Sequence, residues 1–435
     1  MPNPPLTYDA RNMMAKAVGR AGTTPAELRS LARRMEQAKR DVKELSMTGA
    51  QGWLSLPDDT GMVRRVMSLA REKRDFSTCL VIGIGGSDLG ARCLDMALNG
   101  AGMELAFAGA NTDPDELHAI LKGLDLKRTF INVISKSGDT IEPMATFFIV
   151  RDALIRAVGS KRHAEHIVAT TDAESGSLRD LATREGYDTL PVPGNVGGRF
   201  SVLSDVGLFP LACAGVDIRR LLQGARQERD RFVREATLSN GPSLFAALNY
   251  LAVEKRGQHI HVLMPYAESL RGFGFWFRQL WAESLGKRVV RGKKTLNVGP
   301  TPVAALGATD QHSQIQLYNE GPNDKTITFI RVESFRHNVR IPAAIKDIPS
   351  LAPLAGMPLE RILHAEEQGT AAALTAAKRP NGVISIPAVT PEAMGSLIMF
   401  FELATAVSGQ LYGLDAFDQP GVEAGKRATR AILTA

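Results

Sequence analysis

A glycine-rich loop directly after an apolar run is the feature that most constrains the fold of this chain. Residues 79–82 read Cys-Leu-Val-Ile, and the loop at residues 83–90 then contains Gly83, Gly85, Gly86, Ser87, Asp88 and Gly90. A buried strand that ends in glycines and leads into a helix is typical of α/β proteins, where such a turn presents backbone N–H groups to an anionic ligand. A plain tight turn between strand and helix is the alternative.

Two nucleotide-binding motifs fail at this loop because of their spacing. A dinucleotide fingerprint needs a glycine where Asp88 stands, and a Walker loop needs a Gly-Lys-Ser/Thr ending that the loop lacks. The next strand candidate also ends without an acidic residue, since residues 108–111 read Ala-Gly-Ala-Asn. The sequence therefore argues against a nicotinamide-dependent dehydrogenase.

A second strand-to-helix turn carries hydroxyls and a lysine. Residues 130–134 read as a short buried strand, and a helix with Pro143 in its first turn is expected shortly after them. Between strand and helix lie Ser135, Lys136, Ser137 and Thr140. Hydroxyl donors, backbone N–H groups and the helix dipole together suit a phosphoryl group. A helix cap would need only one hydroxyl, so a phosphate site is favoured over a cap.

The composition is that of an ordinary globular protein. The 435 residues allow two or three domains, and a net charge of +6 is spread along the chain rather than gathered in basic blocks, so nucleic acid is not indicated as a partner. The three cysteines, Cys79, Cys93 and Cys213, lie in apolar surroundings and suit core thiols of a reducing cytoplasm. No window matches a signal peptide or reaches the length of a membrane span, so we expect a cytoplasmic protein with no membrane partner.

The order of predicted elements indicates two α/β domains. Residues 8 to about 46 are expected to be helical, without strands, and to lie over a larger domain. Strand candidates at 79–84, 104–109, 130–135, 166–170 and 188–192 alternate with helices, as in a parallel sheet whose ligands bind at the strand carboxyl ends. A charged helical stretch at 218–238 offers a boundary, and further strand candidates follow at 258–264, 326–332 and 382–387. We assign residues 1–60 to an N-terminal helical segment, 61–228 to the first domain and 229–435 to the second.

One predicted helix carries a candidate base. Residues 271–285 form a helix with an apolar side that stops at Gly286, and Gln279 and Glu283 share a face at i, i+4. Apolar neighbours would partly desolvate the carboxylate of Glu283, which raises its pKa and suits a general base. A surface ion pair between Glu283 and Lys287 is the alternative.

Three further residues can carry chemistry, and for each a structural role is also open. His312 lies among polar residues and suits a proton shuttle or a capping group. Arg199 follows Gly197 and Gly198 in a turn where its guanidinium could meet an oxyanion, or could be solvated. Lys426 lies in a short helix that ends the chain, where a solvated lysine is the alternative to a catalytic one. Neither the pair His259 and His261 nor the pair His163 and His166 has a third ligand nearby, so we expect no metal site.

Taken in order, these segments resemble the phosphoglucose isomerase family in its shorter bacterial form, from about residue 50 to the C-terminus. Six blocks carry the resemblance: residues 83–90, 135–140, 197–201, 279–287, 307–314 and 418–426. The resemblance implies two doubly wound parallel-sheet sugar-isomerase domains, a cytosolic homodimer and no cofactor. It also implies a sugar-phosphate substrate and the interconversion of glucose 6-phosphate and fructose 6-phosphate.

The resemblance also implies roles for individual residues. Glu283 would move the proton between C2 and C1, Lys426 and His312 would open the ring, and Arg199 would stabilise the enediolate. The histidine would come from the neighbouring subunit. Two binding sets follow: Ser135, Lys136, Ser137 and Thr140 for the phosphate, and Gly86, Ser87, Gly198, Gln279 and Gln419 for the sugar.

The chain departs from the family at Asp139, where a second threonine is usual in the phosphate loop. A carboxylate facing the ligand would repel phosphate. An isomerase that also accepts mannose 6-phosphate stays an open alternative. A catalytically silent sugar-phosphate sensor is less favoured, because such a protein would keep the phosphate loop but lose the base.

Overall fold

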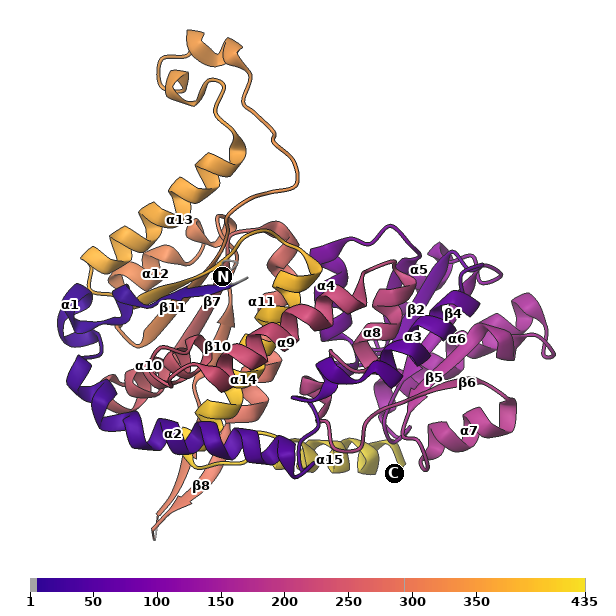
Figure 1. Ribbon diagram of the computed structural model, residues 1–435. Helices are drawn as coiled ribbons and strands as arrows, with labels where there is room; N and C mark the ends of the chain where they lie inside the picture. The colour runs from indigo at the N-terminus through magenta and orange to yellow at the C-terminus, as the bar shows by residue number, and fades with distance from the viewer. Residues whose placement is uncertain (1–5, 293, 435) are drawn as a thin grey trace.

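The structure is a computed structural model that describes residues 6–292 and 294–434 (Figure 1). Within these residues the chain forms two five-stranded sheets and one two-stranded hairpin. Helices cover both faces of each sheet, as expected for a doubly wound α/β protein.

The first sheet is entirely parallel and has the order β3-β2-β4-β5-β6. Its strands are β2 (Thr78–Ile82), β3 (Glu104–Ala108), β4 (Thr129–Ile134), β5 (Ile167–Thr171) and β6 (Asp188–Pro191). All five predicted strands of this half are thereby confirmed. One face packs on α5 (Pro114–Gly123), α6 (Ile141–Val158) and α7 (Ser177–Glu185), and the other on α3 (Thr60–Glu72), α4 (Leu89–Leu98) and α8 (Asp205–Cys213).

The second sheet has the order β1-β12-β11-β7-β10 and is parallel except for β1. The predicted strands are confirmed as β7 (Ile260–Pro265), β11 (Lys325–Val332) and β12 (Asn381–Ile386). One face packs on α12 (Ile315–Glu320) and α13 (Leu359–Ala376). The other faces α9 (Ile218–Arg234), α10 (Gly241–Arg256), α11 (Arg271–Leu285) and α14 (Pro391–Tyr412).

The structure adds strands that the sequence did not indicate. The expectation of an N-terminal segment without strands was wrong, because β1 (Thr7–Asp9) pairs antiparallel with β12. The short helix α1 (Ala15–Val18) and then α2 (Pro25–Met47) follow, and a capping box between Thr24 and Glu27 starts α2. The strand β10 (Thr301–Ala304) and the hairpin β8 (Lys287–Arg291) and β9 (Lys294–Val298) were also missed.

A single apolar cluster joins the two sheets. It contains Val81 of the first sheet and Ile384 of the second, with α9 and α14 between them. The assigned boundary at residue 228 falls inside α9, so the division into domains stays a prediction.

The helix α14 corrects the expectation that no segment of the chain is apolar over the length of a membrane span. Among the described residues it is long and apolar enough to cross a membrane, but 94% of its apolar window is buried inside the protein. Its apolar character is that of a core helix.

Two segments project from this body. A long arm at residues 333–358 extends away from α13, and the hairpin β8–β9 extends from the opposite side (Figure 1). The chain ends in α15 (Glu423–Thr434), which buries none of its described residues.

Candidate active site

The helix α11 presents Gln279 and Glu283 on its open face because its aromatic side chains turn inward. Phe273, Trp276 and Phe277 are buried in the core, and the helix stops at Gly286 as predicted. Gln279 Nε2 donates to Glu283 Oε1 at 3.0 Å, and the side chain of Glu283 is 34% exposed. Gln279 therefore orients the carboxylate of Glu283, which is exposed enough to contact a ligand.

The ion pair between the carboxylate of Glu283 and Lys287 is not formed. Lys287 Nζ instead donates to the main-chain carbonyls of Glu283 at 2.6 Å and Asp418 at 2.5 Å. These two hydrogen bonds fasten the segment that contains Asp418 to the end of α11. Burial lowers the pKa of Lys287.

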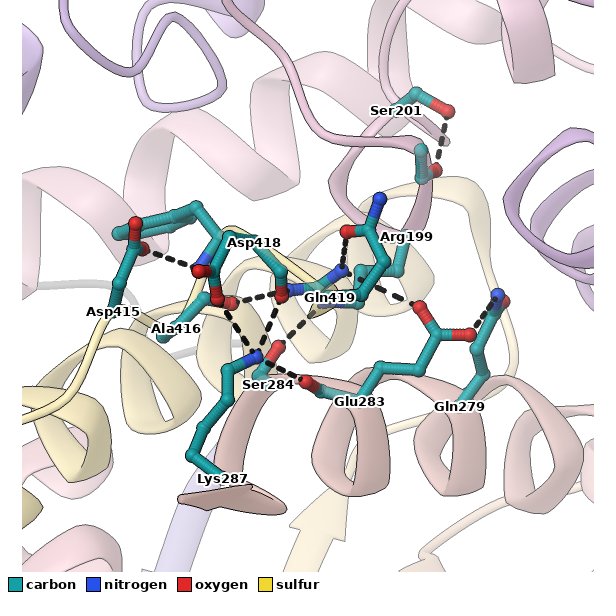
Figure 2. A network of polar contacts seen from close by, with 12 residues as sticks. Arg199, Ser201, Gln279, Glu283, Ser284, Lys287, Asp415, Ala416, Asp418 and Gln419 are labelled. Carbon is teal, nitrogen blue, oxygen red and sulfur yellow. Dashed lines mark hydrogen bonds and ion pairs between the residues drawn. The ribbon is translucent and has the colours of Figure 1, made fainter. Parts of the chain in front are cut away.

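Arg199 is the centre of the polar network shown in Figure 2. Its side chain is 2% exposed, and burial lowers the pKa of its guanidinium. Nη1 donates to Glu283 Oε2 at 3.3 Å and to Gln419 Oε1 at 2.9 Å. The other acceptors are Ser284 Oγ at 2.7 Å from Nε and the carbonyls of Ala416 and Asp418 at 2.5 and 2.9 Å from Nη2. All five N–H donors of this arginine are therefore used.

The glycine-rich loop reaches this network through contacts that leave no room for side chains. A Cβ on Gly86 would lie 2.1 Å from the carbonyl oxygen of Gly198, and one on Gly85 would lie 2.7 Å from Gln279 Nε2. Gly85 also has φ +59°, which favours glycine. The short 3₁₀ helices η4 (Gly85–Ser87) and η6 (Gly198–Phe200) are thus in contact. Of the predicted sugar-site residues, Gly86 and Gly198 meet beside Arg199, Gln279 contacts Glu283, and Gln419 contacts Arg199, while Ser87 is the last residue of η4.

The predicted phosphate loop lies between β4 and α6. Ser135 Oγ accepts from the backbone N–H of Gly138 at 3.1 Å, and Ser137 Oγ accepts from that of Asp139 at 3.2 Å. Thr140 is the N-cap residue of α6, but its side chain makes no capping hydrogen bond. The hydroxyl protons of all three residues therefore stay available for a ligand.

Three contacts connect this loop to other segments. Lys136 Nζ donates to the carbonyl of Gly194 at 2.8 Å, which ties the loop to the segment that leads to Arg199. The carboxylate of Asp139 accepts from Ser177 Oγ at 2.7 Å, and the carbonyl of Asp139 accepts from Arg430 Nη2 at 3.1 Å. The contact with Arg430 brings α15 to the predicted phosphate loop.

The structure does not bring Lys426 and His312 into the network. Lys426 is 58% exposed and forms an ion pair with Glu423 at 2.9 Å. It lies four residues before Arg430, so the two side chains share one face of α15, the face that contacts Asp139 through Arg430. His312 follows the 3₁₀ helix η8 (Thr309–Gln311), and its exposed ring makes no hydrogen bond within residues 6–292 and 294–434. The adjacent Gln311 is fixed, since Tyr266 donates to it at 2.7 Å.

Three of the four histidines that were weighed as metal ligands have other partners. His261 Nδ1 accepts from Trp281 Nε1 at 3.0 Å, His166 Nδ1 lies 2.9 Å from the carbonyl of Thr129, and His163 Nδ1 lies 2.7 Å from the carbonyl of Ser160. In the part of the chain that the structure describes, no group of three or more His, Cys, Asp or Glu side chains is arranged to hold a metal ion.

Sequence reasoning missed some of the groups that hold Arg199 in place. Ser284 lies next to Glu283 and was not considered, and Lys287 was considered only as an ion-pair partner of the carboxylate of Glu283. The carbonyls of Ala416 and Asp418 lie more than 200 residues from Arg199 in the sequence, and no side-chain pattern indicates a backbone acceptor.

Comparison with known proteins agrees with this arrangement. The family model described as phosphoglucose isomerase matches residues 69–435. The glucose-6-phosphate isomerase of Carboxydothermus hydrogenoformans is 40% identical over 442 residues, which cover 98% of this chain and 94% of that protein.

Two solved structures resemble the chain over most of its length. A hypothetical protein of Thermus thermophilus has a TM-score of 0.89 at 35% identity, covering 99% of this chain and 100% of that one. A glucose-6-phosphate isomerase of Chlamydia trachomatis has a TM-score of 0.77 at 27% identity, covering 86% and 73%. The glycine-rich loop, the arginine network and the extent of these matches lead to one conclusion: the chain belongs to the phosphoglucose isomerase family.

Proposed function

We infer that this protein is an isomerase that interconverts D-glucose 6-phosphate and D-fructose 6-phosphate. One observation carries the proposal: the carboxylate of Glu283 lies between Gln279 and the buried Arg199, beside the glycine contact of Gly86 and Gly198. Moving a hydrogen between two adjacent carbons needs one base next to a fixed cation. Family membership supplies the substrate class.

Glu283 acts as the base. It removes the proton from C2 of the open-chain aldose, which gives a cis-enediolate, and returns it to C1, while the proton of the C2 hydroxyl passes to the oxygen on C1. The positive charge of the Arg199 guanidinium, whose Nη1 faces Glu283 and Gln419, stabilises the negative charge of the enediolate oxygen. Because Arg199 is fixed by Ser284 and two carbonyls, little reorganisation accompanies the development of charge.

The phosphate binds at the loop formed by Ser135, Lys136, Ser137 and Thr140. The hydroxyl oxygens of Ser135 and Ser137 accept from the loop backbone, which fixes the loop while their protons point to a ligand. The N-terminus of α6 adds its dipole. Ser177 Oγ donates to the carboxylate of Asp139 and holds it toward the start of α7, so we expect its charge to weaken phosphate binding little.

Ring opening is assigned to Lys426 and to His312 of a second subunit, in a homodimer that shares its active sites. His312 is exposed and lies outside the network of Arg199 and Glu283 in its own subunit, as a residue that completes the site of a partner would. The projecting arm at residues 333–358 carries exposed apolar side chains, Val339, Ile348 and Leu351, which suit contact with a partner. A cytoplasmic location agrees with the three buried, unpaired cysteines.

A coupled assay with purified protein tests the function. Wild-type protein should convert fructose 6-phosphate to glucose 6-phosphate, and Glu283→Gln should lower kcat by about 10³-fold or more with KM little changed. Glu268→Gln is the matched control, because Glu268 lies just before α11 and pairs with the exposed side chain of Arg271. No conversion by the wild-type protein would exclude the function, and near-normal kcat in Glu283→Gln would exclude this base.

A further inference from the structure

The predicted phosphate loop at residues 135–140 has little positive charge of its own. Lys136 is the one cationic residue in this part of the sequence, and its Nζ already donates to a main-chain carbonyl. Three carboxylates lie in or beside the loop: Asp139 within it, Glu142 in the first turn of α6, and Asp172 after β5. Backbone hydrogen bonds and the charge of Lys136 lower the pKa of Asp172. A phosphate ester carries close to two negative charges at neutral pH, so its binding here calls for a further cation.

The helix α15 brings such a cation to the loop. Arg430 Nη2 donates to the carbonyl of Asp139 at 3.1 Å, and this is the only hydrogen bond of its guanidinium within residues 6–292 and 294–434. An arginine has five N–H donors, so four of them lack an acceptor there. The planar guanidinium matches two oxygens of a phosphate. Arg430 is thus held at the loop with most of its donors available for the group that the loop binds.

The course of α15 follows the site from one end to the other. Gln419, four residues before the helix, accepts from Arg199 Nη1, whereas Arg430 near the end of the helix contacts the phosphate loop. Between these contacts the helix runs along the lower side of the molecule toward α7 (Figure 1). Because α15 buries none of its described residues, polar contacts at its two ends rather than packing hold it there.

We propose that Arg430 binds the phosphate group of the substrate. The guanidinium donates to phosphate oxygens while the loop supplies its backbone N–H groups and hydroxyls. Its charge also offsets the carboxylates of Asp139 and Asp172 near the dianion. The inference rests on the proposed function, because it takes the ligand of the loop to be a sugar phosphate.

Calorimetric titration of the full chain with 6-phospho-D-gluconate tests the proposal without turnover. Arg430→Gln should weaken binding of this probe by about tenfold or more, because a charge-assisted pair of hydrogen bonds to the phosphate is lost. Glutamine keeps the helix propensity of arginine, so α15 should persist. Arg430→Lys keeps the charge but not the planar fork, and should recover part of the affinity.

Arg427→Gln is the matched control. Arg427 lies on the same helix, is exposed, and makes no hydrogen bond to the loop within the part of the chain that the structure describes. Its replacement removes the same charge and should change the Kd of 6-phospho-D-gluconate by less than about twofold. D-gluconate, which lacks the phosphate, should bind equally to wild type and to Arg430→Gln.

The pH dependence separates a contact with phosphate from a structural role. The second pKa of a phosphate ester is near 6, so the probe is mainly a monoanion at pH 5 and a dianion at pH 8. The loss of affinity in Arg430→Gln should therefore be larger at pH 8 than at pH 5, by about threefold. In steady-state kinetics KM for fructose 6-phosphate should rise by about tenfold with kcat little changed, since the contact is made equally before and during the reaction.

Three results would overturn the proposal. Equal binding of 6-phospho-D-gluconate by wild type and Arg430→Gln would do so and leave the isomerase function standing. An equal loss in Arg427→Gln and Arg430→Gln would assign the effect to the general charge of α15 instead. A wild-type protein that does not bind the probe at all would remove both this contact and the phosphate loop from the substrate site.

Discussion

Arg199 holds three parts of the protein together through one side chain. Its five donors bind acceptors on α11 and on residues 416–419. A lysine has three donors and no planar fork, so Arg199→Lys leaves several buried acceptors unpaired. We expect kcat to fall by about 10²-fold or more and the free energy of unfolding to fall by at least about 2 kcal/mol.

Steady-state kinetics and urea unfolding measure the two effects. Arg278→Lys is the control, since Arg278 also belongs to the α11 region but is exposed and lies over Phe275. A normal kcat in Arg199→Lys would show that Arg199 does not stabilise the enediolate, whatever its effect on stability.

Glu402 makes stability depend on pH. It is 0% exposed in α14, neither of its oxygens has a hydrogen-bond partner among the described residues, and burial raises the pKa of its carboxyl well above 4.5. The folded protein keeps a proton that the unfolded chain loses above about pH 4.5, so the free energy of unfolding falls as pH rises through this range. Burial also raises the pKa of Glu228 to about 7, which adds to the fall.

Glu402→Met should therefore stabilise the protein, by about 1–3 kcal/mol at pH 8 and by less at pH 5. Urea unfolding at the two pH values measures the difference, with Glu320→Met at an exposed position as control. An equal gain at both pH values would contradict a protonated Glu402.

The residues around the base differ in how far the sequence could predict them. Gln279 and Glu283 were predictable as neighbours because the helical period places them on one face, and their hydrogen bond confirms it. The carbonyls of Ala416 and Asp418 that Arg199 binds were not predictable, because tertiary packing alone brings this segment to it. The same holds for Asp139, whose orientation depends on Ser177 at the start of the next helix.

At the scale of elements, the phosphate loop makes a separate prediction. Ser137→Ala with Thr140→Ala removes two hydroxyl donors from the N-terminus of α6, each worth roughly 1.5–3 kcal/mol to a bound phosphate. Inhibition constants of phosphorylated competitive inhibitors should rise by about 10²-fold or more, while the melting temperature changes little.

Asp139→Thr is the companion variant. Because Ser177 holds the carboxylate of Asp139, its replacement should change these inhibition constants by less than about threefold. Markedly tighter binding in Asp139→Thr would show that this aspartate faces the phosphate. Unchanged constants in the double variant would place the phosphate elsewhere.

The elements that the sequence predicted are those with strong local signals. Most of the predicted strands are buried apolar runs before a turn, and all of the predicted strands were confirmed. The strand β1 has three residues, and its pairing with β12 depends on the fold. Pro302 lies in β10, and a proline is typical of a strand only at an edge position, which cannot be recognised before the sheet is known.

At the scale of the whole molecule, subunit exchange tests the shared site. If His312 completes the site of a partner, inactive His312→Ala and inactive Glu283→Gln subunits recover one intact site in each mixed dimer. Equal amounts refolded together should regain roughly a quarter of wild-type activity, because about half the dimers are mixed and each has one working site.

Differential tagging shows whether mixed dimers form. If they form and activity stays at the level of the parent variants, His312 acts within its own subunit or not at all. A protein that stays monomeric at assay concentration and is fully active would exclude the shared site.

The place of α14 in the common core has a consequence for synthesis of the chain. This helix is buried along nearly all of its length, and its cluster includes residues from Leu6 to Tyr412. A ribosome must therefore release almost the entire polypeptide before the central core can close. During most of translation the apolar surfaces of α9 and both sheets lack their partner, so the nascent chain depends on protection from aggregation until its last helices emerge.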